Sequence, residues 1–303
     1  MFREVEFQSE GATLRGMLYL PTSRAPKAPL VIMGHGTSAT VYMVADKYAE
    51  ALSQAGFAAL LYDHRNLGRS GGEPRGELNP WIQCRGFRDA INFAETLDEV
   101  DRDRIALWGD SWAGAHVMVV AAIDPRVKAI IAQIPGCGSA VPSIEPTAAT
   151  LEVIKETFHR GDICGTPETT TGPMPVVSFD QVGVPSLLKP IQAFRWFIDY
   201  GGRPGSHWIN RAARVLPPTP VPYSAVLSAP FIKVPALVMV APDDEMENAN
   251  PKVSKHAYDL MSGPKQLYEI HGGHFGLLYH PSERFDEATG VQISFLNQWL
   301  KGA

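Results

Sequence analysis

Short apolar runs alternate with helical patterns along most of this chain, and no other sequence feature constrains the fold as strongly. Runs such as Pro29–Met33, Ala58–Tyr62 and Arg104–Trp108 are typical of strands that are covered on both faces. The segments between them carry apolar residues at helical intervals, as in Trp81–Leu97. This β-α-β order predicts a mostly parallel sheet with helices on both of its faces.

The same order extends towards both ends of the chain. Two alternating runs, Glu4–Phe7 and Thr13–Tyr19, predict an antiparallel pair at one edge of the sheet. The remaining elements that we expect are helices at Lys47–Ala55, Trp112–Ile123, Val253–Met261 and Val291–Leu300, and strands at Val127–Ile134, Ala236–Ala241 and Gln266–Ile270.

One long interruption separates the two regular parts. Between about residues 138 and 229 the chain is rich in Pro, Gly and Thr and contains one clear amphipathic helix, Ile191–Tyr200. We interpret it as an insertion after the sixth strand. The expected organisation is a first core part at 1–137, an inserted helical lid at 138–229 and a second core part at 230–303.

Composition and charge exclude several classes of function. The chain has 303 residues, enough for a large core without disulfides or metal, and its formal net charge of -5 argues against nucleic-acid binding. The basic cluster Arg85–Arg88 lies in a helical pattern and predicts a solvated face. Three cysteines are an odd number without paired spacing, which favours a reducing compartment. The charged N-terminus and the lack of a long apolar run predict a cytoplasmic protein without a membrane segment.

The strongest chemical signal is the run Gly109-Asp110-Ser111-Trp112-Ala113-Gly114, between a predicted strand and a predicted helix. A serine on such a tight turn exposes its hydroxyl group, which is the physical content of the G-x-S-x-G nucleophile elbow. Ala113 stands where the pattern has a second glycine, so the match is weaker. The alternative is that Ser111 only caps the helix.

A nucleophilic serine needs a base and a group that orients the base. Proteins with this elbow carry the three residues in the order serine, acid, histidine. Downstream, predicted strands end at Pro242-Asp243-Asp244-Glu245 and at His271-Gly272-Gly273-His274, so all three groups lie at the carboxyl edge of the sheet. We expect Asp244 and His274 to act with Ser111, with Asp243 and His271 as alternatives. A metal site at the two histidines is disfavoured because no other ligand motif accompanies them.

Acyl transfer also needs hydrogen-bond donors for the oxyanion. The predicted strand Pro29–Met33 leads into Gly34-His35-Gly36-Thr37, and we expect the backbone N–H groups of Thr37 and Trp112 to be these donors. His35 is an alternative base, but its place beside Gly36 favours a role in holding this loop. No cofactor is expected.

The amphipathic helix of the insertion carries Ile191, Phe194, Phe197 and Ile198 on one side, with Trp196 and Tyr200 near the edge. This stripe is most simply explained by packing of the lid onto the core. Alternatively, Phe194, Trp196 and Phe197 line an apolar substrate pocket.

These motifs together resemble those of α/β-hydrolase-fold serine hydrolases, in particular the dienelactone-hydrolase-like and Xaa-Pro dipeptidyl-peptidase-like branch. Asp63–Gly72 is similar to the D-x-R-x-x-G-x-S-x-G loop of that branch, and the runs NPWIQCRGFRDAINF and VDRDRIALWGDS fit as well. Fungal polyketide-transferase-like and thiohydrolase-like proteins share the pattern. The resemblance covers about 1–136 and 230–303 and implies an α/β-hydrolase fold with Ser111, Asp244 and His274 as the triad.

The expected function is therefore a serine hydrolase of the carboxylesterase type. It would cleave an ester, thioester or amide of a small, mostly apolar acyl substrate through an acyl-enzyme. Three alternatives stay open: an acyltransferase or thiohydrolase that releases a polyketide from a thioester, a peptidase, and a non-catalytic small-molecule receptor. The expected partner is a small-molecule substrate rather than a nucleic acid or a membrane, and self-association is left open.

Overall fold

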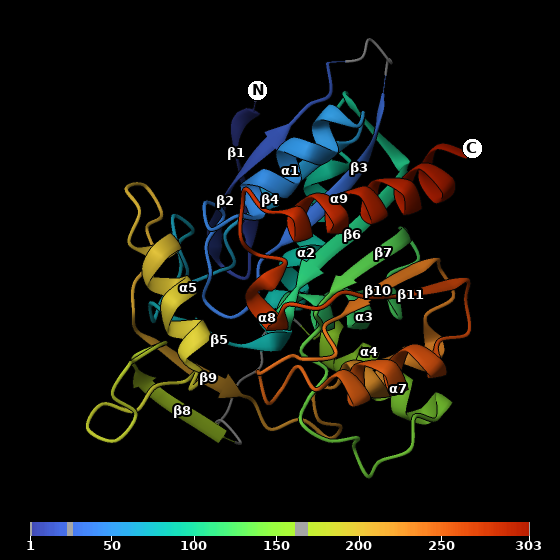
Figure 1. The fold of residues 1–303 in the computed structure, drawn as a ribbon. Helices are drawn as coiled ribbons and strands as arrows, with labels where there is room; N and C mark the ends of the chain where they lie inside the picture. Colours follow the sequence, from blue (N-terminus) through green and yellow to red (C-terminus); the bar gives the residue numbers. More distant parts are fainter. Residues whose placement is uncertain (1, 23–26, 161–168, 303) are drawn as a thin grey trace.

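The computed structural model describes residues 2–22, 27–160 and 169–302, and an eight-stranded sheet forms its centre (Figure 1). The strand order is β1-β2-β4-β3-β6-β7-β10-β11. β2 pairs antiparallel with β1 and β4, and every other neighbouring pair is parallel. The predicted mostly parallel sheet is thus confirmed. The strands are β1 (Phe2–Ser9), β2 (Ala12–Tyr19), β3 (Ala28–Gly34), β4 (Ala58–Tyr62), β6 (Val100–Asp110), β7 (Val127–Gln133), β10 (Ala236–Val240) and β11 (Lys265–Glu269).

Helices cover both faces of this sheet, because successive residues of its strands point to opposite sides. In β3, Leu30 and Ile32 pack into one apolar cluster, whereas Val31 and Met33 pack into the other. The first cluster includes residues of α2, α3 and α7, and the second includes residues of α1 and α9. These helices are α1 (Ala45–Gln54), α2 (Pro80–Ala94), α3 (Ser111–Ala121), α7 (Pro251–Leu260) and α9 (Glu283–Leu296).

The last helix begins earlier than the apolar pattern predicts. Ser282 caps α9, since its hydroxyl group accepts a hydrogen bond of 3.1 Å from Phe285 N. The first turn carries Glu283 and Asp286, which suit the positive end of a helix but do not contribute to an apolar stripe. A further helical turn, Asn297–Gly302, follows α9.

The basic cluster of α2 differs from the prediction of a solvated face. Arg85 is fully buried, and its Nε lies 2.9 Å from Oε1 of Glu10. Arg88 lies 3.1 Å from the same carboxylate. Glu10 stands in the turn between β1 and β2, which packs over α2, so the partner that permits burial of Arg85 is 75 residues away in the sequence.

The insertion contains strands as well as helices. β8 pairs antiparallel with β9, and β9 pairs parallel with β5, which lies before α2. These short strands were not predicted, because β8 is made of Thr, Gly, Pro and Met without clear alternation. The division into core and lid stays a prediction. The elements involved are β5 (Glu77–Leu78), α4 (Ala148–His159), β8 (Thr169–Met174), α5 (Ile191–Gly201), β9 (Ala212–Leu216), α6 (Ala225–Ser228) and the 3₁₀ turn Ala229–Phe231.

Helix α5 buries a different stripe from the expected one. Trp196, Phe197 and Tyr200 are buried, whereas Ile191 and Ile198 are exposed. The indole N–H of Trp196 donates a hydrogen bond of 2.7 Å to the carbonyl oxygen of Leu278, which turns the aromatic side of the helix towards the core.

None of the helices in the described residues is both long and apolar enough to cross a membrane, and these residues hold no cluster of three or more metal-ligating side chains. Cys84 and Cys137 are buried free thiols, whereas Cys164 lies outside the described residues.

Candidate active site

Ser111 stands on a tight turn between β6 and α3. Its φ of 51° is in the left-handed region, which is strained for a residue other than glycine. The turn leaves no room for a Cβ at Gly109, which would overlap with the carbonyl oxygen of Ala113, and Gly114 lies against Pro135. Ala113 itself is fully buried without conflict. The tight positions are therefore 109 and 114, and alanine at 113 is compatible with the elbow.

The structure brings Ser111, His274 and Asp244 together in one chain of hydrogen bonds. Nε2 of His274 lies 2.9 Å from the Ser111 hydroxyl oxygen, and Nδ1 lies 2.8 Å from Oδ2 of Asp244. The side chains of His274 and Asp244 are only 3% and 1% exposed. Since Asp244 follows β10 and His274 follows β11, these two residues and Ser111 meet at the carboxyl edge of the sheet.

The loops that carry the acid and the histidine are tied to each other. Oδ1 of Asp244 accepts a hydrogen bond of 2.8 Å from Met246 N, and Glu245 accepts one of 2.9 Å from His274 N. Gly272 and Gly273 have φ values of 138° and 69°, which only glycine adopts readily. These contacts fix the position of the imidazole relative to Ser111.

The alternative acid and histidine form a separate pair at the surface. The side chains of Asp243 and His271 are 51% and 77% exposed, and Oδ1 of Asp243 lies 3.7 Å from Nδ1 of His271. Asp243 accepts a hydrogen bond of 3.1 Å from Gly272 N and so supports the histidine loop from outside. The geometry therefore favours Asp244 and His274.

The loop after β3 packs directly against the serine. A Cβ at Gly36 would lie 2.5 Å from Cβ of Ser111. Thr37 follows Gly36 and lines the same cavity as Ser111 and Trp112. The N–H of Trp112 belongs to the first turn of α3, where backbone donors have no acceptor within the helix. Both expected oxyanion donors thus belong to residues that border the space in front of the serine.

His35 holds the loop after β3 in place through hydrogen bonds of both of its ring nitrogens. Its Nδ1 lies 2.8 Å from Asp110 Oδ1, and its Nε2 lies 2.8 Å from the carbonyl oxygen of Met43. Burial alone lowers the pKa of His35, but the neighbouring Asp110 carboxylate outweighs this effect, and the pKa lies above its usual value. Gly36 N also donates to Asp110, at 3.0 Å. This geometry fits a role in holding the loop rather than in proton transfer.

Gly36→Ala is expected to lower kcat by about 100-fold, the cost of a displaced oxyanion donor. The added methyl group cannot coexist with Ser111 in its present position, so either the serine or the Thr37 N–H must move. Steady-state kinetics with an activated ester measures this loss. Gly290→Ala is the control, because this glycine is exposed in α9, has no left-handed φ, and a Cβ there meets nothing within 4 Å. Equal activity of both variants would contradict the expectation.

The loop that resembles the D-x-R-x-x-G-x-S-x-G motif lies beneath the site. The buried Asp63 carboxylate accepts hydrogen bonds of 2.9 Å from Val41 N and Arg69 N, and thereby joins this loop to the segment before α1. The adjacent His64 is buried among aromatic rings, and neither of its ring nitrogens has a hydrogen-bond partner. Burial, with a smaller contribution from His35, lowers the pKa of His64 to about 3.

His64→Met is expected to reduce the sensitivity of the fold to acid. Because the folded-state pKa of His64 lies below the usual 6.5, the unfolded chain binds the proton more tightly. The contribution of neutral His64 to the free energy of unfolding is fully present above pH 6.5. It decreases between pH 6.5 and pH 3 by about 1.4 kcal/mol per pH unit. The free energy of unfolding, measured by urea titration at several pH values between 7 and 4.5, should therefore fall less steeply with decreasing pH for the variant than for the wild type. The substitution of the exposed His271 by Gln serves as control. If His64→Met has the same pH dependence of the unfolding free energy as the wild type, His64 does not cause the acid sensitivity.

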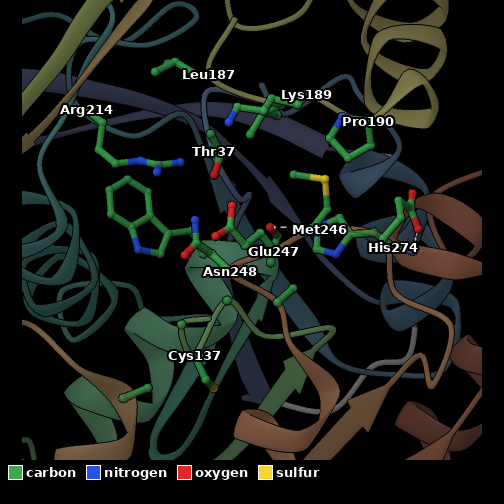
Figure 2. A pocket seen from close by; sticks show the side chains of 18 of the residues that line it. Thr37, Cys137, Leu187, Lys189, Pro190, Arg214, Met246, Glu247, Asn248 and His274 are labelled. Carbon is green, nitrogen blue, oxygen red and sulfur yellow. Dashed lines mark hydrogen bonds between the residues drawn. The ribbon is translucent and has the colours of Figure 1, made fainter. Parts of the chain in front are cut away.

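A cavity of about 380 Å³ opens in front of Ser111 (Figure 2). Its walls are largely apolar, with charged side chains among them. Apolar side chains come from Leu187, Leu188, Pro190, Leu216 and Met246. Charged and polar side chains come from Lys189, Arg214, Glu245, Glu247 and Asn248.

The three expected aromatic pocket residues do not line this larger cavity. Trp196 and Phe197 border a smaller cavity of about 30 Å³ beside Ser111 and His274. Phe194 borders neither cavity, because its ring packs on Phe179 at a centroid distance of 5.9 Å. The larger cavity is lined instead by the segment before α5 and by β9. No periodic pattern marks these segments, so the sequence carries no signal for them.

The chain is similar in sequence to several known proteins. The protein-family profile described as alpha/beta hydrolase fold matches residues 29–157. The thiohydrolase apmlB of Arthrinium phaeospermum is 31% identical to this chain, over 97% of this chain and 95% of that protein. The acyltransferase drtE of Aspergillus calidoustus is 27% identical, over 99% and 96% of the two chains.

A solved structure is also similar over its whole length. The alpha/beta hydrolase GrgF from Penicillium sp. sh18 has a TM-score of 0.74 and 22% identity, with 99% of each chain covered. At this identity the likeness concerns the fold. Together with the match to apmlB over nearly the whole chain, it shows that the protein belongs to the α/β-hydrolase family.

Proposed function

We propose that the protein is a serine hydrolase that cleaves acyl esters or thioesters through an acyl-enzyme. The observation that carries this proposal is the chain of hydrogen bonds from Asp244 through His274 to Ser111, at 2.8 and 2.9 Å. A receptor of the same fold has no need of a serine in a strained turn with a buried histidine and acid aligned behind it.

In the proposed mechanism the Ser111 hydroxyl oxygen attacks the substrate carbonyl carbon. Nε2 of His274 accepts the hydroxyl proton and then delivers it to the leaving alcohol or thiol. Asp244 holds the imidazole in the required tautomer and stabilises the imidazolium that forms. The N–H groups of Thr37 and Trp112 bind the oxyanion. Water, activated by His274, then releases the acid and restores Ser111.

The cavity and the relatives support an acyl substrate with an apolar part. Leucine, proline and methionine side chains form much of the wall beside Ser111. Thiohydrolase relatives, with apmlB covered over nearly its whole length, support a thioester as the scissile bond. A thioester is attacked by the same machinery as an ester, because only the leaving group differs.

Acyl transfer is the second candidate, because drtE is named an acyltransferase and matches nearly the full chain. In this reaction an alcohol or thiol replaces water in the second step. The cavity is open to the outside, so an acceptor has access to the acyl-enzyme. Product analysis with and without an added alcohol, at equal substrate consumption, separates the two activities.

Labelling with a fluorophosphonate tests the nucleophile first. The wild type should gain one adduct by intact-mass measurement, and the adduct should be lost in Ser111→Ala. Hexanoyl esters of 4-nitrophenol and hexanoyl thioesters of N-acetylcysteamine then measure the preference between scissile bonds. A folded wild type that is neither labelled nor active on either substrate would refute the proposed function.

A further inference from the structure

Arg214 of β9 projects into the cavity in front of Ser111, where its guanidinium group points towards Thr37 (Figure 2). The residue is half-buried, and its guanidinium carbon lies 5.5 Å from the centre of the Trp112 ring. Such a contact holds a cation in place without neutralising its charge. Arg214 is thus a fixed positive charge inside an otherwise largely apolar space.

No carboxylate of the described residues forms an ion pair with Arg214, and its buried Nε has no hydrogen-bond partner. Other arginines removed from water differ in having a carboxylate within ion-pair distance, although the guanidinium nitrogens of Arg85 likewise have no hydrogen-bond partner. The fully buried Arg85 lies against Glu10, and the half-buried Arg126 lies 2.7 Å from Asp124. Burial lowers the pKa of Arg214 from its usual value, which reflects the cost of holding this charge without a counter-ion.

The other charged groups of the cavity do not neutralise it. Glu245 accepts a hydrogen bond from His274 N and so belongs to the histidine loop. Glu247 and Lys189 are exposed and therefore solvated at the opening. Among the described residues that line the cavity, Arg214 is accordingly the charged group that is partly desolvated and lacks a partner in the protein.

If Arg214 binds an anionic group of the substrate, its position restricts how far this group lies from the scissile bond. Trp112, on which the guanidinium lies, directly follows Ser111, and all three residues line one cavity. An anion bound there is close to the scissile carbonyl. The phosphates of a carrier arm are separated from a thioester by the whole pantetheine chain, so they do not fit this position. A carboxylate suits the guanidinium fork, which binds both of its oxygens at once.

We infer that Arg214 binds a carboxylate of the substrate, so that the preferred substrates are esters or thioesters bearing a free carboxylate near the scissile bond. This inference rests on the proposed hydrolase function and adds a substrate class to it. The apolar wall then contacts the hydrocarbon part, and Arg214 fixes its orientation.

Matched substrates that differ only in charge test this inference. One series consists of the mono-4-nitrophenyl esters and N-acetylcysteamine thioesters of glutaric, adipic and pimelic acids, each compared with its ω-methyl ester. A second series, 4-hexanoyloxybenzoate and its methyl ester, places the carboxylate on the leaving group. In at least one series, wild-type kcat/KM should be about 10-fold or more higher for the free carboxylate, because hydrogen bonds to charged groups strengthen binding.

Arg214→Met should remove this preference and lower kcat/KM for the favoured carboxylate substrate by about 10- to 100-fold. The neutral esters should change by less than about threefold. Arg214→Lys should keep part of the preference because it keeps the charge but not the fork. Arg211→Met removes an exposed arginine that does not line this cavity, and it should behave as wild type. No preference in either series, or an equal loss on charged and neutral substrates, would overturn the inference.

Binding to Ser111→Ala separates this inference from the proposed function. Monomethyl adipate should raise the Tm of Ser111→Ala, but not that of Ser111→Ala/Arg214→Met. Without ligand, Arg214→Met should unfold at the wild-type temperature or above it, because an unpaired charge is removed. If the wild type hydrolyses nothing and is not labelled, the proposed function fails, yet this binding result still decides the role of Arg214. An equal effect of the ligand on both variants would overturn that role.

Discussion

Ser111→Ala is expected to lower kcat for hexanoyl esters and thioesters by about 10⁵-fold or more. The hydroxyl group is the only group removed, and its oxygen lies 2.9 Å from Nε2 of His274. Without it no acyl-enzyme forms, and only the weak catalysis by the oxyanion donors and by substrate binding is left. Steady-state kinetics and the loss of fluorophosphonate labelling measure the effect together.

A matched control excludes loss of folding as the cause. Ser294→Ala removes a hydroxyl group from the exposed face of α9, far along the chain from the site, and should leave kcat unchanged. Ser111→Ala keeps a non-glycine residue at the same strained φ of 51°, so its Tm should lie close to that of the wild type. Residual activity above about 1% in a variant with wild-type Tm would show that Ser111 is not the nucleophile.

Asp244→Asn is expected to lower kcat by about 10⁴-fold, because the amide stabilises the wrong tautomer of the histidine. The carboxylate is almost fully buried, and its Oδ2 lies 2.8 Å from Nδ1 of His274. An amide nitrogen at this place donates a hydrogen bond instead of accepting one. Nε2 then carries the proton and cannot accept another from Ser111.

The neighbouring residue provides the control for this prediction. Asp243→Asn makes the same chemical change one position earlier, on a side chain that is half exposed and contacts Gly272 N. Its kcat should stay within about threefold of the wild type, since surface substitutions have small effects. A larger loss for Asp243→Asn than for Asp244→Asn would show that Asp243, and not Asp244, orients the histidine.

The regular part of the fold follows from local sequence pattern. Runs such as Pro29–Met33 and Ala58–Tyr62 lack polar residues, and the structure covers both faces of these strands. The antiparallel pair at the sheet edge also forms as predicted, with Val5 opposite Gly16. In each case the pattern of apolar and polar residues within the segment indicates which of its faces are buried. The strand can therefore be identified without knowledge of a distant partner.

The parts of the fold that differ from the predictions depend on distant partners. Arg85 is buried only because Glu10 lies over α2. The strand β9 exists through pairing with β8 and with β5, and its own five residues carry little pattern. Helix α5 buries Trp196 and Phe197 rather than its isoleucines because the carbonyl oxygen of Leu278 accepts the indole N–H.

The candidate site divides in the same way. The order of Ser111, Asp244 and His274 along the chain, each after a predicted strand, is enough to predict that they lie on one edge of the sheet. Neighbouring residues such as Asp243 and Asp244 have the same local context, so only the folded loop distinguishes the buried carboxylate from the exposed one.

The cavity belongs entirely to the tertiary structure. Its wall combines Thr37, Leu188, Arg214 and Met246, which come from four separate segments without helical or strand periodicity in common. Local pattern therefore determined the sheet, the elbow and the sets of candidate residues, because each of these depends on neighbours in the sequence. Packing between distant segments decided which candidate carboxylate lies against His274, the wall of the cavity and the position of the unpaired Arg214, because a cavity is formed by surfaces that meet only after folding.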